Sequence, residues 1–228
     1  MISVINIDKS FDSKKVLNNL KQDFALAEVH GIIGLNGAGK TTFFNILSSF
    51  MKTDSGEILY NRKKISRNDV AYLETINFFY SKITGKEYLE IFPLTNQQFE
   101  LEKINKLLKL PFDEIIETYS TGMKKKLALM AIIKQDKPIY IFDEPYNGLD
   151  LETNMALEII IRNLQKKEKT IFVSSHILSP LLNVCDEIHL LQQGSFSKNY
   201  TKENFNNIEK ELFEDFNKSA SEIIADSI

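Results

Sequence analysis

One stretch of the sequence combines glycines, a lysine and hydroxyl side chains in a pattern that binds polyphosphate. It reads Gly34-Leu35-Asn36-Gly37-Ala38-Gly39-Lys40-Thr41-Thr42, and it follows an apolar run and opens a predicted helix. Glycines let the backbone curl so that its N–H groups converge on an anion, and the helix N-terminus adds partial positive charge. Lys40 would bind the outer phosphates, and the Thr41 hydroxyl would bind a Mg²⁺ that those phosphates share. The pattern predicts a nucleotide site but does not distinguish ATP from GTP.

A pair of carboxylates follows a second apolar run. The segment Ile139-Tyr140-Ile141-Phe142 predicts a buried strand that ends at Asp143 and Glu144. Ligands bind at the carboxyl ends of parallel strands. Asp143 would hold Mg²⁺ through its water shell, and Glu144 would be the general base that polarises the attacking water. The alternative is that the pair only caps the turn at Pro145.

A third segment lies between these two and reads Tyr119-Ser120-Thr121-Gly122-Met123-Lys124-Lys125-Lys126-Leu127. Ser120 is a typical N-cap residue, and Leu127, Met130 and Ala131 supply an apolar helix face. In isolation the segment is an ordinary helix start. In this order and spacing it resembles the signature motif of ABC ATPases, in which a serine and a glycine open a helix that faces the nucleotide.

Three further features agree with this resemblance. The segment Asn147-Gly148-Leu149-Asp150 resembles the D-loop of the family, and His176 resembles the switch histidine that contacts the γ-phosphate. Phe11 occupies the place of an aromatic residue that stacks on adenine. Taken alone, Phe11 is equally a core or edge residue, and His176 is a satisfied polar residue at a strand end. The resemblance covers the chain from about Ile2 to Gly194.

The resemblance implies a set of site residues and a metal cofactor. Glu144 and His176 would be catalytic, and Thr41 and Asp143 would bind Mg²⁺. The residues implied in ATP binding are Phe11, Gly34, Asn36, Gly37, Ala38, Gly39, Lys40, Thr41, Thr42, Ser120, Gly122 and Asp150.

The resemblance also implies an activity and partners. The activity is hydrolysis of ATP to ADP and phosphate by a head-to-tail pair, with each ATP between Lys40 of one protomer and Ser120 and Gly122 of the other. We expect a homodimer that drives an integral membrane permease on another chain, from a cytoplasmic position on the inner face of the cell membrane. The short helical region, without a large C-terminal regulatory domain, resembles exporters more than sugar importers.

One position departs from the family pattern. The family places a glutamine, sometimes a glutamate, a few residues after a strand such as residues 70–73, where it touches Mg²⁺ and the attacking water. Alignment puts Thr75 at this position, and Glu74 could substitute only if the loop is shifted. The shorter reach of threonine affects the expected metal coordination and hydrolysis rate, but not nucleotide binding.

Composition excludes several other classes of protein. The 228 residues carry a formal net charge of −3, so no basic field favours nucleic acid as a partner. The apolar runs are strand-sized and too short to cross a bilayer, and the N-terminus lacks the pattern of a secretory signal. The single cysteine, Cys185, fits a reducing compartment and is predicted to be a small buried residue on a helix.

The predicted fold is α/β, a P-loop NTPase core with a mixed sheet, an antiparallel β subdomain and a helical subdomain. Residues 1–200 would form the ABC-type nucleotide-binding domain, with the helical subdomain inserted at about 76–137. Residues 201–228 would form a helical tail whose apolar positions are Ile208, Leu212, Phe213, Phe216, Ile223 and Ile224.

Local patterns predict the individual elements. Strands are expected at residues 2–7, 23–28 and 28–33, followed by a helix over 40–50 and a hairpin of residues 57–60 and 63–65. Strands at 139–143 and 170–174 flank a helix near 152–167, which is a βαβ crossover and implies parallel strands.

Two other functions remain open at this point. One is an ABC ATPase that acts on nucleic acid or ribosomes, although such proteins usually carry a long coiled-coil insertion or two nucleotide domains in one chain. The other is a regulatory ATP-binding module with little turnover, which the threonine at position 75 suggests.

Overall fold

The fold is described from a computed structural model, which describes residues 1–95 and 99–211. The strands are β1 (Ile2–Phe11), β2 (Lys14–Phe24), β3 (Val29–Ile33), β4 (Ser55–Tyr60), β5 (Lys63–Lys64), β6 (Val70–Leu73), β7 (Ile139–Phe142), β8 (Thr170–Ser174), β9 (Glu187–Gln192) and β10 (Ser195–Thr201). The helices are α1 (Lys40–Leu47), α2 (Gly85–Glu90), α3 (Leu101–Leu108), α4 (Thr121–Lys134), α5 (Leu151–Lys166) and α6 (Leu178–Val184), with short 3₁₀ turns η1 (Ile116–Thr118) and η2 (Lys202–Asn204).

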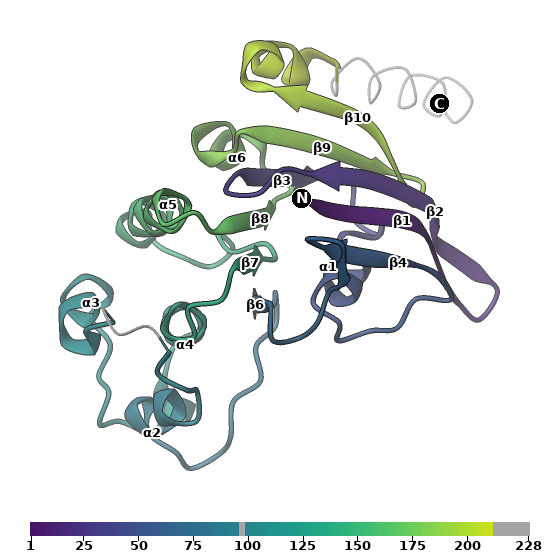
Figure 1. Ribbon diagram of the computed structural model, residues 1–228. Helices are drawn as coiled ribbons and strands as arrows, with labels where there is room; N and C mark the ends of the chain where they lie inside the picture. The colour runs from purple at the N-terminus through teal and green to yellow at the C-terminus, as the bar shows by residue number, and fades with distance from the viewer. Residues whose placement is uncertain (96–98, 212–228) are drawn as a thin grey trace, which may run out of the picture.

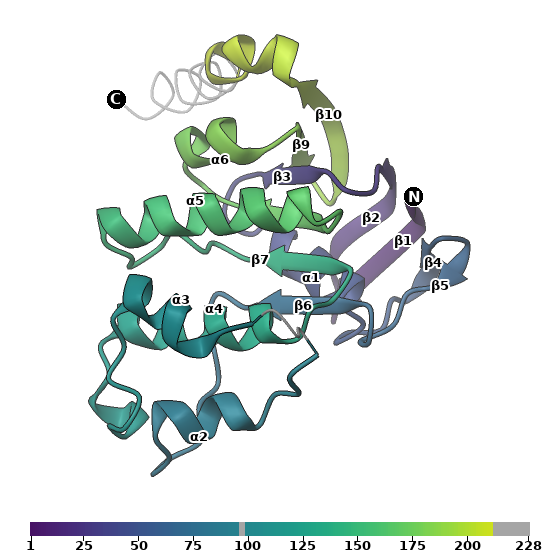
Figure 2. The same cartoon turned by 60° about the vertical axis from the view of Figure 1, so that its left-hand side comes forward.

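Within the described residues, the strands form two sheets. The central sheet has the order β10-β9-β3-β8-β7-β6, and the antiparallel sheet has the order β2-β1-β4-β5. All neighbours in the central sheet are parallel except β9 and β10, so this sheet is mixed. Figures 1 and 2 show α5 and α6 on one side of the central sheet and the antiparallel sheet on the other. These layers confirm the predicted fold class.

The buried strands of the central sheet contribute side chains to two separate hydrophobic cores. On β7, Tyr140 and Phe142 pack with α4, α5 and α6, whereas Ile139 and Ile141 pack with α1 and the antiparallel sheet. Successive side chains of a strand point to opposite faces, so a strand covered on both sides is apolar throughout. α1 fills the space between the sheets, with Phe43 and Phe44 fully buried. This arrangement fixes the carboxyl end of β7 next to the start of α1.

A third core belongs to the predicted helical region. It joins residues of α2, α3 and α4, among them Tyr88, Leu108 and Leu127. α2 begins with a complete capping box, in which Thr84 and Glu87 exchange hydrogen bonds between side chains and backbone N–H groups. Figure 2 shows these helices beyond β6, at the edge of the central sheet. The helical pattern was expected to begin near residue 76, but the first helix begins at Gly85.

Asp8 links the strands of the antiparallel sheet. Its carboxylate accepts hydrogen bonds from the backbone N–H of Asn19 on β2 at 2.9 Å and from the hydroxyl of Ser55 on β4 at 2.9 Å. The ammonium of Lys15 lies 2.7 Å from the same carboxylate. These contacts hold the pKa of Asp8 at about 2, with the hydrogen bond to Lys15 as the largest cause.

The structure corrects one predicted strand and adds others. Residues 25–28 are not a strand, because Ala27 adopts a positive φ of 59° between β2 and β3. β2 instead covers Lys14–Phe24, where the buried residues are Leu17, Leu20 and Phe24. β1 and β2 pair with several bulges, so burial does not alternate with a period of two. β9 and β10 were also not predicted.

Other sequence predictions agree with the structure. The hairpin of β4 and β5 turns at residues 61–62, and β7, α5 and β8 form the predicted crossover. Cys185 is fully buried at the end of α6. Within residues 1–95 and 99–211, no helix is both long and apolar enough to cross a lipid bilayer. Of the predicted tail, Ile208 is buried, and the other apolar positions from Leu212 onward lie outside the described residues.

Candidate ATP-binding and catalytic site

The phosphate-binding loop connects β3 directly to α1. β3 ends at Ile33, and the helix begins at Lys40 with Gly39 as its N-cap. Gly34 lies against β9, where an added Cβ would be 2.4 Å from the carbonyl oxygen of Leu191. Gly37 has a φ of 82° and nothing within 4 Å of an added Cβ. The first glycine is therefore required by packing and the second by backbone conformation.

Lys40 lies at the centre of the site. Its side chain is buried, and its Nζ donates a hydrogen bond to the carbonyl of Gly34 at 2.7 Å. The same Nζ is 3.8 Å from Oε1 of Glu144. Burial of a charge is unfavourable unless it is paired, and here a carbonyl and a carboxylate supply the partners. The lysine and the predicted general base therefore face each other across one site.

Asp143 is fully buried and held by three hydroxyl groups. Its Oδ2 accepts from Thr41 at 2.8 Å and from Tyr72 at 3.4 Å, and its Oδ1 accepts from Ser174 at 2.6 Å. Burial, followed by the charge of Asp143, raises the pKa of Tyr72, so the phenol stays protonated and donates. These three donors fix the orientation of the Asp143 carboxylate.

Glu144 combines an unusual backbone with a close histidine partner. Its φ is 50°, which is uncommon for a residue other than glycine and typical of functional sites. Its backbone N–H donates to the hydroxyl of Ser174 at 2.9 Å. Nδ1 of His176 lies 2.8 Å from Oε2 of Glu144, and the N–H of His176 donates to the same oxygen at 3.3 Å. The carboxylate is thus fixed from the end of β8.

These groups surround one cavity of about 600 Å³. Lys14, Val16, Leu35, Thr75 and Asn147, which were not among the predicted site residues, also line it. Gly34 and Ala38 are not in the lining, although Gly34 contacts Lys40 through its carbonyl. The predicted site residues that line the cavity are Phe11, Asn36, Gly37, Gly39, Lys40, Thr41, Thr42, Asp143, Glu144 and His176.

Besides Gly34 and Ala38, three predicted ATP-binding residues from other segments lie outside this cavity. Ser120 is the N-cap of α4, as predicted, and accepts from the N–H of Met123 at 3.2 Å. Gly122 lies against the backbone of Gly148, where an added Cβ would be 3.0 Å from the carbonyl oxygen. Asp150 caps α5 and accepts from both the N–H and the hydroxyl of Thr153. A single chain therefore does not bring these residues to the phosphate loop.

The residue at the usual glutamine position is Thr75. Thr75 lines the cavity, and its hydroxyl donates to the carbonyl oxygen of Asp143 at 3.4 Å. Glu74 is not in the lining, and its backbone carbonyl accepts from the side chain of Asn77. The loop therefore presents the threonine to the site, as the alignment indicated.

Sequence reasoning missed two residues that position the carboxylates. Lys125 is buried on α4, and its Nζ donates to the carbonyls of Glu144 at 2.6 Å and Asn147 at 3.0 Å. Burial lowers the pKa of Lys125. Ser174 bridges Asp143 and Glu144. The position of Ser174, a hydroxyl residue at the end of an apolar strand, could have suggested its role. Lys125 is the middle one of three consecutive lysines, and the sequence does not indicate which of them is buried.

Comparisons with known proteins show the family of this chain. Residues 17–147 match the family model described as ABC transporter. The lantibiotic transport ATP-binding protein SrtF of Streptococcus pyogenes is 28% identical over 220 residues, which cover 93% of this chain and 96% of SrtF. The structure of an ATP-binding subunit of an ABC transporter matches with a TM-score of 0.82 at 25% identity, covering 90% of this chain and 91% of that chain.

A dimeric ATP-binding cassette in a post-hydrolysis state, bound to ADP and phosphate, has the same fold. Its TM-score is 0.78 at 20% identity, and the match covers 89% of this chain and 99% of that chain. The family match begins before the phosphate loop at Lys40 and extends past the carboxylates Asp143 and Glu144. The chain therefore belongs to the ABC transporter family, as an ATP-binding and ATP-hydrolysing subunit.

Proposed function

We propose that two copies of this chain bind two Mg²⁺-ATP between them and drive an export permease of the membrane. The observation that carries the proposal is the meeting of Lys40, Glu144 and His176 at one cavity, with distances of 3.8 Å and 2.8 Å to the glutamate. Lys40 would bind the outer phosphates, Phe11 would stack on adenine, and Glu144 would take a proton from the attacking water. His176 would orient Glu144 and contact the γ-phosphate.

Residues at the start of α1 and at the end of β7 fit a magnesium ion. Thr41 and Asp143 present oxygen atoms 2.8 Å apart at the cavity, and Mg²⁺ prefers oxygen ligands from a hydroxyl, a carboxylate and phosphates. When bound, the ion would offset negative charge on the phosphates. Ser174 and Tyr72 would keep the Asp143 carboxylate oriented for this role.

The placement of α4 supports a composite site. Ser120 is exposed at the start of α4 and lies outside the cavity of its own chain. The N-terminus of a helix binds anions well, because its N–H groups are unpaired and its dipole is positive there. We infer that Ser120 and Gly122 face the phosphates held by Lys40 of a partner protomer, with Asp150 near the same interface. A cassette with the same fold is dimeric and bound to ADP and phosphate, which supports a dimer here.

The segment between β6 and α2 is the proposed contact with the permease. Ile76, Phe78 and Tyr80 are 85%, 72% and 53% exposed, and the rings of Phe78 and Tyr80 lie 5.2 Å apart. Exposed apolar clusters of this kind mark protein contacts. Because Thr75 of the same segment lines the cavity, a permease docked there would respond to nucleotide.

The remaining expectations belong to the same proposal. The subunit would sit on the cytoplasmic face of the cell membrane as a homodimer. Residues 1–200 would be the nucleotide-binding domain and 201–228 a helical tail. SrtF is a lantibiotic transport ATP-binding protein, which supports movement of a compound across the membrane. The short helical region favours export over import.

The proposal is tested by Glu144→Gln, which keeps the shape of the side chain but removes the base. We expect ATP binding to persist and hydrolysis to slow by roughly 10²–10⁴-fold, the range for losing a general base. The ATP-bound dimer should then accumulate and be detected by light scattering. Glu57→Gln, an exposed change on β4, is the matched control and should hydrolyse ATP at the parental rate.

A second pair of changes tests the composite site. Asp and Asn both cap helices well, but only Asp would bring a negative charge to the phosphates of the partner's nucleotide. In the Glu144→Gln background, Ser120→Asp should abolish the ATP-dependent dimer, while Ser120→Asn should weaken it less. Equal dimerisation by both variants would contradict the placement of α4 against ATP.

A further inference from the structure

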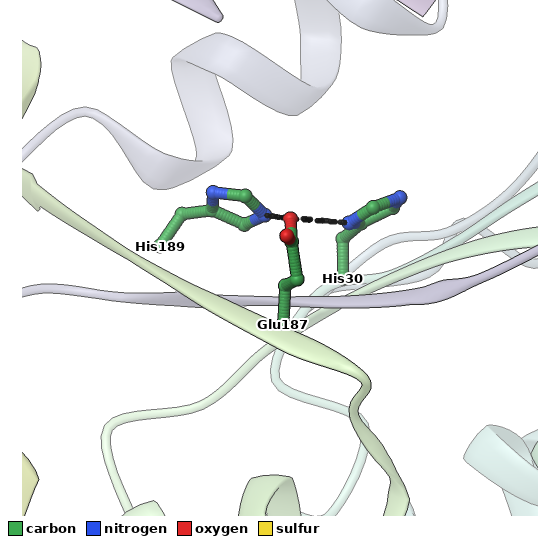
Figure 3. A group of neighbouring side chains, drawn as sticks. All are labelled: His30, Glu187 and His189. Carbon is green, nitrogen blue, oxygen red and sulfur yellow. Dashed lines mark hydrogen bonds and ion pairs between the residues drawn. The ribbon is translucent and has the colours of Figure 1, made fainter. Parts of the chain in front are cut away.

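Two of the three histidines of the chain meet at a site that the ATP cavity does not include. His30 lies on β3, and His189 and Glu187 lie on β9. In the parallel pairing of these strands, His30 is opposite Glu187 and Ile32 is opposite His189. Residues two apart on a strand share a face, so Glu187 and His189 point the same way. Figure 3 shows the three side chains converging on one point.

The converging atoms have the separations of metal ligands. Nε2 of His189 is 3.3 Å from Nδ1 of His30, and Oε2 of Glu187 is 3.5 Å from the first and 3.9 Å from the second. A tetrahedral Zn²⁺ with bonds of about 2.0–2.1 Å holds two nitrogen ligands about 3.3 Å apart. The observed nitrogen separation therefore already matches such a site.

The proton of His30 is held on the nitrogen that faces away from this point. Nε2 of His30 lies 2.9 Å from the carbonyl oxygen of Ala25. A carbonyl only accepts, so Nε2 carries the hydrogen. In the neutral imidazole, Nδ1 then has a free lone pair directed at His189 and Glu187.

A chain of side-chain amides fixes His189 in the same manner. The amide of Gln22 donates to the carbonyl of Asp23, so its oxygen accepts from the amide nitrogen of Asn199 at 3.2 Å. The oxygen of Asn199 then faces Nδ1 of His189 at 3.0 Å and must accept from it. Nε2 of His189 is therefore the unprotonated nitrogen. An outer hydrogen bond that fixes the tautomer of a histidine is the usual support of a metal ligand.

Two lone pairs and a carboxylate thus face one another in an apolar setting. Both histidines are fully buried, and the ring of Phe24 lies 5.1 Å from His30 and 4.8 Å from His189. Three electron-rich atoms without a cation between them repel one another. The Glu187 side chain is 33% exposed.

We propose that His30, Glu187 and His189 bind one divalent transition metal of the Zn²⁺ class. Two imidazoles and a carboxylate suit Zn²⁺ and disfavour Mg²⁺, which prefers oxygen ligands. The site is therefore chemically distinct from the oxygen ligands Thr41 and Asp143. A bound ion would tie β3 to β9 and stabilise the folded chain, because unfolding separates the ligands.

The test uses the full chain without a histidine tag, stripped of metal and titrated with Zn²⁺ in excess Mg²⁺ and without nucleotide. We expect one saturable equivalent by calorimetry and a rise in Tm. Co²⁺ should give the visible absorption of a tetrahedral site. Asn199→Ala removes the hydrogen bonds of this amide to His189 and Gln22 but no proposed ligand, and it should weaken binding by about 10–100-fold. Glu187→Gln, at a partly exposed position, should weaken it at least as much while the variant stays folded.

Two control variants locate the ion. His176→Ala removes the third histidine, and Asp143→Asn removes the carboxylate of the ATP site; both should bind Zn²⁺ as the parent does. Absence of a saturable Zn²⁺ equivalent in the parent overturns the proposal. So does a folded Glu187→Gln variant with parental affinity, or binding that is lost in Asp143→Asn.

Discussion

Nδ1 of His176 lies 2.8 Å from Oε2 of Glu144, and the backbone N–H of the same histidine donates to that oxygen at 3.3 Å. His176, which follows β8, thereby orients the carboxylate of Glu144, which follows β7. Oε1 of the glutamate faces Lys40 at 3.8 Å. One oxygen is thus held by histidine while the other faces the cation of the phosphate loop, which makes the geometry of Glu144 depend on both neighbours.

His176→Ala removes the imidazole and keeps the backbone N–H contact. We expect kcat to fall by about 10²-fold or more, because the general base loses its orientation, while the affinity for ATP changes little. Steady-state ATPase kinetics and binding of a fluorescent ATP analogue separate the two effects. Loss of affinity with unchanged kcat would show that His176 serves binding alone.

Lys125→Met removes the ammonium that bridges the carbonyls of Glu144 and Asn147. Both carbonyls lose a charged donor, so the free energy of unfolding should fall by about 1–3 kcal/mol. Hydrolysis should fall as well, since Glu144 and the following loop lose a common anchor. Urea unfolding and ATPase rates measure these effects. Lys103→Met, an exposed change on α3, should leave both near the parental values.

Lys40→Ala should abolish tight ATP binding, because it removes the buried cation of the phosphate loop. Lys14→Ala is the informative comparison. Lys14 lines the same cavity but is exposed, so solvent and salt screen its charge and the loss of affinity should be small. Equilibrium binding at two salt concentrations tests this, and a Lys14 effect as large as that of Lys40 would contradict it.

Asp8→Asn tests the contacts that hold the antiparallel sheet. The folded-state pKa of Asp8 is about 2, below its usual 3.8, so the folded protein binds the proton less well than the unfolded chain. The stabilisation is therefore complete above about pH 4 and is lost as the pH falls toward about 2. In urea unfolding, Asp8→Asn should be less stable than the parent at neutral pH, and the gap should narrow in acid. A gap independent of pH would assign the effect to packing.

The parts of the fold that follow local rules could be predicted from the sequence. The phosphate loop, the hairpin around residues 61–62 and the crossover from β7 to β8 each depend on residues close together in the chain. β2 could not be predicted, because bulges space its buried residues Leu17, Leu20 and Phe24 three and four apart, which imitates a helix.

Contacts between segments that are distant in the chain could not be predicted from the sequence either. Ser174 reaches Asp143 across neighbouring strands, and nothing in the run of lysines at 124–126 distinguishes Lys125 until α4 is packed. The pairing of His30 with Glu187 depends on the register of β3 and β9, which the sequence did not reveal since β9 itself was not predicted. Strand register and helix packing, rather than residue type, are the features that could not be predicted from the sequence.

The two glycines of the phosphate loop carry different information for anyone reading a mutational scan of this chain. Gly34 lies too close to the Leu191 carbonyl for any side chain, so every replacement there would disrupt the central sheet. Loss of transport in such a variant would therefore give no information about nucleotide binding. Gly37 has open space around it and a left-handed backbone that asparagine tolerates best among larger residues. Only at Gly37 would the relative activities of different replacements give information about nucleotide binding.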